Sequence, residues 1–131
     1  MNESLEKSAI GLDGNLAAAL GYPIGILGLV SFFIEKQNKF VKFHGIQSVL
    51  YSLGLWVGFT VLLIVLFILS AILAFVSGTL ATLISALTGL LGFGVFLIWF
   101  ASLLFFAYKA YQGQMFKLPI VGNIAENLAN K

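Results

Sequence analysis

A cluster of polar side chains at the start of a long apolar run is the part of this sequence best suited to chemistry. His44, Gln47, Ser48 and Tyr51 follow one another at offsets of three and four, so a helix would place them on one side. A second polar group closes the last apolar segment and would reach the same leaflet of a membrane; its members are Tyr108, Lys109, Tyr111 and Gln112. Two interpretations stay open: an interfacial belt of aromatic residues and lysine, or a polar vestibule that receives a lipid headgroup, a solute or a partner's loop.

Neither group has the composition of a catalytic or metal site. His44 is the single histidine and the chain has no cysteine, so nothing completes a metal site around it. Between His44 and Lys109 there is no Asp, Glu, Lys or Arg to supply an acid, a base or a nucleophile at depth. His44 itself is interpreted as a polar group that bonds to headgroups or a neighbouring helix, or alternatively as a pH-sensitive or ligand-binding group. The sequence predicts a non-enzyme with no cofactor.

The composition indicates the class of protein that positions these residues. Of the 131 residues, 60% are hydrophobic and 9% are charged, against about 45–50% and 25% in soluble domains. A small globular protein cannot hide that much apolar surface. The net charge of +2 is too small to suggest nucleic acid as a partner. The sequence therefore predicts an all-α, polytopic integral membrane protein whose single domain spans residues 1–131.

Apolar segments of about one bilayer thickness predict three crossings. They cover residues 15–34, 46–76 and 90–111, each long enough for the roughly 30 Å of hydrocarbon. Pro23 predicts a kink in the first segment but no break. Residues 77–79 predict a turn and residues 80–87 a short shallow helix, while residues 1–14 form a polar lead.

Two further segments are expected to lie in the membrane interface. In residues 35–45, Lys36, Lys39 and Lys42 form a basic face that suits lipid headgroups, with an aromatic face beside it. In residues 114–131, Ile120 and Ile124 begin an apolar stripe that Leu128 completes. A short helix on the cytoplasmic surface, close to the three lysines, is expected there.

The distribution of lysines favours three crossings over four. With three, six lysines share one side and Lys7 alone faces them; the six are Lys36, Lys39, Lys42, Lys109, Lys117 and Lys131. With four crossings the division is four against three, and the usual cytoplasmic excess disappears. The expected topology is a multi-pass protein of the cell membrane with its N-terminus outside and its C-terminus in the cytoplasm.

Small residues mark the faces on which helices could approach one another closely. Gly21 and Gly25 belong to a small-residue stripe in the first segment, and Gly54 and Gly58 form a GxxxG motif in the second. Packing within the chain and self-association are both open interpretations.

Three blocks of sequence resemble a family of small prokaryotic membrane proteins of unknown function. They are residues 15–22, residues 34–48 with the run FHGIQS, and residues 109–125 with the run KLPIVGNIA. That family is similar to the chloroplast inner-envelope import-channel subunit of the Tic type, and it looks related to magnetosome-membrane proteins that influence crystal size. The resemblance implies a fold type and a membrane location, and it supplies no activity.

Two functions follow as hypotheses. The first is a scaffold or accessory subunit that associates, through its helices, with itself or with a larger membrane complex in the lipid bilayer. The second is a channel or protein-translocation component, by analogy with the import subunit, in which hydroxyl side chains of several copies would line a pore.

Overall fold

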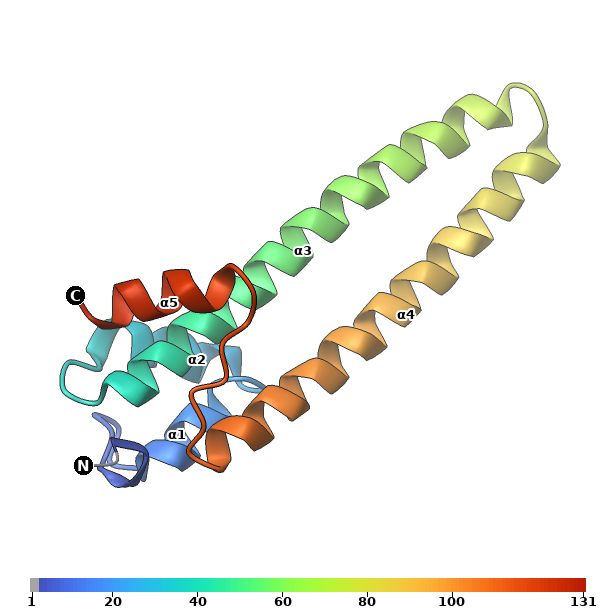
Figure 1. The fold of residues 1–131 in the computed structure, drawn as a ribbon. Coiled ribbons are helices and arrows are strands. Elements are labelled where there is room, and N and C mark those ends of the chain that lie inside the picture. Colours follow the sequence, from blue (N-terminus) through green and yellow to red (C-terminus); the bar gives the residue numbers. More distant parts are fainter. Residues whose placement is uncertain (1–2) are drawn as a thin grey trace. The chain divides into compact units, whose positions relative to one another are not determined.

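The computed structural model describes residues 3–131 and is helical, with no strand in that range (Figure 1). Residues 1 and 2 of the expected polar lead lie outside the described range. The elements are η1 (Glu3–Leu5), α1 (Gly14–Leu20), α2 (Gly25–Ile34), α3 (Lys39–Ala74), α4 (Gly78–Tyr111) and α5 (Val121–Ala129).

The chain divides into two compact units. One comprises the described residues up to Ser52 together with Phe100–Lys131, and it carries every Asp, Glu and Lys of the sequence. The other, Leu53–Trp99, carries none. We call them the charged unit and the apolar hairpin. Both α3 and α4 are long and apolar enough to cross a membrane, so two of the expected crossings correspond to long helices.

The apolar hairpin consists of the second part of α3 and the first part of α4. Each arm, residues 53–74 and 78–99, is about 33 Å long at the usual helical rise. The arms meet through Trp56 and Trp99, whose ring centroids are 5.3 Å apart, and through Phe59, which lies beside Gly92. The turn between the arms exposes Phe75 almost fully.

In the charged unit the expected first crossing is two helices instead of one kinked helix. α1 ends at Leu20, α2 begins at Gly25, and the two pack where Gly21 approaches Gly28. A proline ring clashes with the carbonyl four residues earlier, which favours a break at Pro23. The glycine pair then lets the chain fold back on itself.

Three other boundaries differ from the expectations. The expected interfacial helix and second crossing are one helix, α3, which starts at Lys39. α4 runs without interruption from Gly78, so the expected shallow helix belongs to it. α5 forms within the expected C-terminal segment but buries Gly122, Ala125 and Ala129, whereas Ile120 and Ile124 are exposed. Small side chains allow α5 a closer approach to the unit's core than the isoleucines would.

Candidate functional site

A buried hydrogen-bond network in the charged unit joins Tyr22 to two side chains of α3. The Tyr22 hydroxyl lies 2.8 Å from His44 Nδ1, and Gln47 Nε2 donates to the same hydroxyl at 2.9 Å. His44 and Gln47 are one turn apart on α3, while Tyr22 follows the end of α1 in the break between the two short helices. The network therefore ties the N-terminal helices to the start of α3.

The same side chains hold an extended C-terminal segment that runs between α4 and α5. His44 Nε2 lies 3.0 Å from the carbonyl oxygen of Gln114, and Gln47 Nε2 donates to the carbonyl of Phe116 at 2.8 Å. The backbone N–H of Leu118 donates to Gln47 Oε1 at 3.1 Å. A single glutamine thus binds both a donor and an acceptor of this segment, as a neighbouring strand would.

The partners determine the proton positions in the network. A carbonyl can only accept, so His44 Nε2 carries the proton that it donates to Gln114, and in the neutral ring Nδ1 then accepts from Tyr22. The Tyr22 oxygen in turn accepts from Gln47. These hydrogen bonds all run in one direction, from Gln47 through Tyr22 and His44 to the Gln114 carbonyl. This arrangement requires an uncharged imidazole.

The surroundings of His44 keep it uncharged. Its side chain is fully buried, and the rings of Phe40 and Phe43 pack edge-on against it at 4.6 and 4.9 Å between centroids. A charged imidazole is disfavoured there, because burial among these rings would strip the charge of its hydration. Among the described residues, no buried side-chain nitrogen or oxygen lacks a partner. Chemically, the network can hold segments together, because all its polar atoms are already bonded.

α5 packs over this network through a small apolar core. Ala125 and Ala129 lie against Phe43 and Ile46 of α3 in one buried cluster. A side chain on Gly122 would meet Gln47 Oε1 at 3.0 Å, so glycine is required where α5 passes the network. The C-terminal helix is thus held by packing as well as by hydrogen bonds.

A second set of polar groups, buried or half-buried, gathers at the start of α3. Asn38 Oδ1 accepts from the N–H of Val41, and Glu3 Oε2 accepts from the N–H of Phe40, both at 3.1 Å. Asn38 Nδ2 also donates to the carbonyl of Glu3 at 2.8 Å. Glu35 Oε2 accepts from the N–H of Ala9 at 2.7 Å. Sequence reasoning missed these roles, although acidic and amide residues before a helix are typical caps.

The structure brings together only part of the predicted polar site. His44 and Gln47 join the network, and Ser48 lies beside them with its hydroxyl bonded to the Gly45 carbonyl at 2.9 Å. Tyr51 is directed elsewhere, with its hydroxyl 2.6 Å from Ser102 Oγ. Tyr22 completes the network and was missed. A signal existed, because a buried tyrosine usually needs a partner for its hydroxyl.

The second predicted polar group lies apart from this network, at the end of α4. Tyr108 and Gln112 are exposed and bonded to each other, Gln112 Nε2 to the Tyr108 hydroxyl at 2.8 Å. Lys109 lies over the ring of Phe105, 5.6 Å from its centroid. These positions suit an interfacial belt of aromatic residues and lysine.

The predicted headgroup and packing residues fall into different environments. Lys36 and Lys39 are exposed and Lys42 is half-buried. Gly21 is in close contact, as described above, but a side chain added at the other predicted packing glycines would meet nothing within 4 Å; these are Gly25, Gly54 and Gly58.

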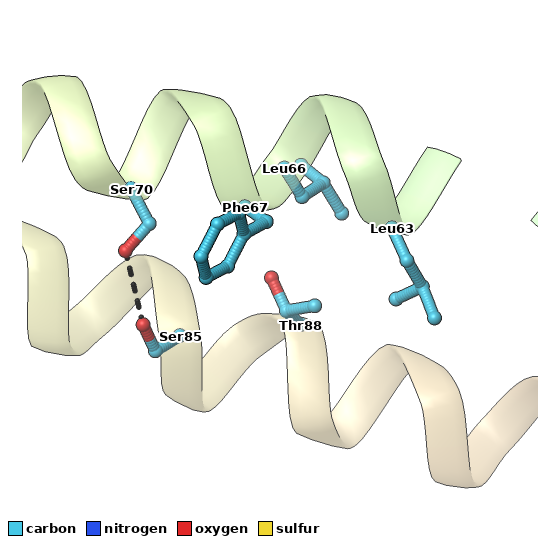
Figure 2. Close-up of a pocket in the computed structure, with 6 residues that line it drawn as sticks. All are labelled: Leu63, Leu66, Phe67, Ser70, Ser85 and Thr88. Carbon is cyan, nitrogen blue, oxygen red and sulfur yellow. Dashed lines mark hydrogen bonds between the residues drawn. The ribbon is translucent and has the colours of Figure 1, made fainter. Parts of the chain in front are cut away.

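The apolar hairpin contains a shallow groove between its arms, with a volume of about 300 Å³ (Figure 2). Ser70 of α3 and Ser85 of α4 close one end through a hydrogen bond of 3.0 Å. The remaining lining is Leu63, Leu66, Phe67 and Thr88. The Thr88 hydroxyl donates to the Ile84 carbonyl of its own helix at 2.8 Å, so this groove offers little polar surface to a ligand.

Comparison with known proteins covers both units. The model of the magnetosome magnetite crystal formation protein family matches residues 9–125. The chain belongs to this family. A UPF0132 membrane protein of Methanocaldococcus jannaschii is 40% identical over 122 residues, which are 92% of each chain. Another, of Archaeoglobus fulgidus, is 36% identical over 113 residues, which are 86% of this chain and 91% of the relative. No solved structure matches.

These relatives support a membrane location and a family without a described reaction. The prokaryotic family and its link to magnetosome proteins were expected from the sequence, and both are confirmed. The similarity to the Tic-type import subunit rests on the sequence resemblance alone.

Proposed function

We propose that the protein is a non-enzymatic membrane scaffold or accessory subunit that associates with other membrane helices through the outer face of α3. The observation that carries the proposal is the GxxxG pair in the apolar hairpin, where added side chains on Gly54 and Gly58 would meet nothing of the described chain. Small residues drive association in lipid when they allow a second backbone to approach closely. At Gly54 and Gly58, the backbone that approaches closely would therefore be that of a partner helix.

A longer pattern on α3 supports the same face. From Gly54 onward, small and β-branched residues recur at alternating offsets of four and three, the period of a helix-packing seam; they are Gly54, Gly58, Val61, Val65, Ile68 and Ile72. The four β-branched members are more than half exposed. The residues that contact α4, including Trp56, Phe59 and Ser70, lie on the other side of the helix.

The channel hypothesis has weaker support. A pore needs hydroxyl groups that face an aqueous path, but Ser70, Ser85 and Thr88 bond within the hairpin. A metal-binding role also has weak support. Among the described residues, no group of three or more His, Cys, Asp or Glu is placed to hold an ion.

Disulfide cross-linking in native membranes tests the proposed face, because the natural chain has no cysteine. A Val61→Cys variant should form a cross-linked dimer, or a cross-link to a partner when a photoreactive group is attached at this position. Adding Gly58→Leu should abolish the product by blocking close approach. The matched control is Gly89→Leu, also at a glycine with open surroundings but on α4, and it should leave cross-linking intact. Equal cross-linking in both variants, or none in the parent, would contradict the proposal.

A further inference from the structure

The proposed function leaves open which parts of the chain face which side of the membrane. We propose that α1 and α2 form a re-entrant helical hairpin, which enters one leaflet and returns without crossing. The N-terminal lead, the basic loop and the C-terminal tail then share the cytoplasmic face. Only α3 and α4 cross, and α2 presents an apolar surface to the acyl chains of the cytoplasmic leaflet.

Contacts between the two ends of the expected first crossing carry the proposal. Asn38, which follows α2, donates to the carbonyl of Glu3 at 2.8 Å, and Glu35 accepts from Ala9 at 2.7 Å. An added side chain on Gly14, at the start of α1, would lie 2.8 Å from the Asn38 amide. If residues 15–34 crossed a bilayer, these groups would be separated by roughly 30 Å of hydrocarbon.

The other end of the chain joins the same face. Asn15 Nδ2 donates to the carbonyl of Tyr111, the last residue of α4, at 3.1 Å. His44 and Gln47 bond the backbone that follows, at Gln114 and Phe116. In Figure 1, α1 and α2 lie beside the start of α3, and both ends of the described chain lie close to them. All of these contacts are within the charged unit.

The depth to which the re-entrant hairpin of α1 and α2 enters the membrane follows from its contacts along α3. Gly45 approaches the Gly28 carbonyl of α2, and the Tyr22 hydroxyl at the tip reaches Gln47. The usual helical rise puts Gln47 about 12 Å along α3 from Lys39. That is less than half of a roughly 30 Å hydrocarbon core, so the tip stays within one leaflet.

The exposed surface of α2 fits lipid. Ile26, Leu29 and Phe33 lie on one face and are 68%, 42% and 69% exposed, while Gly28 and Ser31 on the opposite face are buried against α3. Lys36 and Lys39 follow directly and are exposed. An apolar face that ends in lysines is typical of a helix inserted at the headgroup boundary.

The distribution of charge determines the side. All seven lysines belong to the charged unit, and the hairpin turn at the far end of the crossings carries none. Lysine-rich segments near membrane helices stay in the cytoplasm. The re-entrant arrangement therefore strengthens the lysine bias that three crossings give, since Lys7 joins the other six.

Cysteine labelling of the full chain in intact cells tests the topology. Single variants Leu5→Cys, Gln37→Cys and Asn130→Cys probe the lead, the basic loop and the tail, and Phe75→Cys probes the hairpin turn; all four positions are exposed. With a membrane-impermeant maleimide, Phe75→Cys should be labelled in intact cells, and the other three only after permeabilisation. Labelling of Leu5→Cys but not Gln37→Cys in intact cells would restore the N-terminus-outside topology and overturn the proposal. The fully reversed pattern would contradict the cytoplasmic assignment.

A depth measurement tests the lipid contact separately. A nitroxide on Phe33→Cys in liposomes should be accessible to oxygen and poorly accessible to a water-soluble nickel chelate, but shallower than the same label on Leu90→Cys of α4, an exposed position outside the proposed association face. Full chelate access, or a depth equal to that of Leu90→Cys, would refute insertion into one leaflet. Neither readout depends on self-association, so failure here is distinguishable from failure of the scaffold proposal.

Discussion

Glycines have different environments in the charged unit and in the apolar hairpin. In the charged unit, side chains added at Gly14, Gly28 or Gly45 would overlap neighbouring backbone oxygens at 2.7–2.8 Å. In the hairpin, side chains added at Gly54 or Gly58 would meet nothing within 4 Å. Glycine therefore permits close internal packing at these three positions of the charged unit, whereas the GxxxG pair of the hairpin leaves open surface.

Polar groups differ between the two regions in the same way. The charged unit bonds side chains to segments far away in the sequence, as Gln47 does with Phe116 and Leu118. In the hairpin, Thr82, Ser85 and Thr88 donate to the carbonyl four residues earlier in their own helix. The charged unit is specified by particular contacts, whereas the hairpin is specified mainly by helical period and solvation in lipid.

The largest predicted effect comes from removing the glutamine that clamps the C-terminal segment. Gln47→Leu keeps the size of the side chain but strands the Leu118 N–H and the Phe116 carbonyl. An unsatisfied buried group costs about 1–3 kcal/mol, so the free energy of unfolding should fall by about 3 kcal/mol or more. Thermal unfolding in mild detergent and trypsin cleavage after Lys117 would measure the loss.

The control for Gln47→Leu is Gln112→Leu. Gln112 is exposed, and its side chain bonds only locally, to Tyr108 and Gln114. Surface substitutions of this kind usually change stability by less than about 0.5 kcal/mol. Equal losses in the two variants would mean that the buried network does not hold the unit together.

The second prediction compares the effects on stability of glycine-to-alanine substitutions at two positions. Gly28→Ala would place a methyl group against Ser48 and 2.7 Å from the Gly21 carbonyl oxygen, and overpacking of this kind costs about 1–3 kcal/mol. Gly58→Ala should be neutral or stabilising by up to about 1 kcal/mol, because alanine is the better helix former. Thermal midpoints of both variants in the same detergent would test this contrast. A destabilised Gly58→Ala beside an unaffected Gly28→Ala would reverse it.

The two long helices could be predicted because the signal for them, the absence of charged side chains, can be read from each residue by itself. The charge-free run from Phe43 to Tyr108 is visible without knowing any contact, and it contains the whole apolar hairpin. α5 could also be placed, since Pro119 precedes it and its apolar residues recur with helical spacing. The face that α5 turns to the rest of the unit was not predicted, because the small residues are buried there while Ile120 and Ile124 are exposed.

The fold-back of the N-terminal helices and the network could not be predicted in the same way. Gly21 and Gly28 fall on one stripe of an unbroken helix, but across a break they become facing residues. Apart from the Tyr22 hydroxyl, the partners of His44 and Gln47 are backbone groups of residues 114–118, which any sequence would offer. Composition and period carry no information about which distant backbone a buried side chain meets.

The third prediction concerns pH. The network requires an uncharged His44 in the folded protein, because Nδ1 accepts from Tyr22 while Nε2 donates to Gln114, whereas in the unfolded chain the imidazole takes up a proton near pH 6.5. The unfolded state therefore binds the proton more readily, and stability is lost as pH falls, by ~1 kcal/mol between pH 6.5 and 5.5. Opening should begin in the charged unit, with the tail becoming sensitive to protease while the hairpin keeps its helical circular dichroism. The variant His44→Phe should lack this dependence between pH 6.5 and 5.5; if it retains the full slope, another group is responsible.

The smallest predicted effect lies in the apolar hairpin. The Ser70 hydroxyl bonds to Ser85 at 3.0 Å and to the Ala81 carbonyl at 3.2 Å. Ser70→Ala should cost only about 0.6 kcal/mol, the average for hydrogen bonds between membrane helices. The carbonyl keeps its second donor, since Ser85 bonds it at 2.9 Å, so no polar group is stranded as it is in Gln47→Leu. Unfolding of the two variants in the same bicelles would measure the difference. If Ser70→Ala destabilised the protein as much as Gln47→Leu, the hairpin too would depend on specific polar contacts, and the contrast between the two regions would fail.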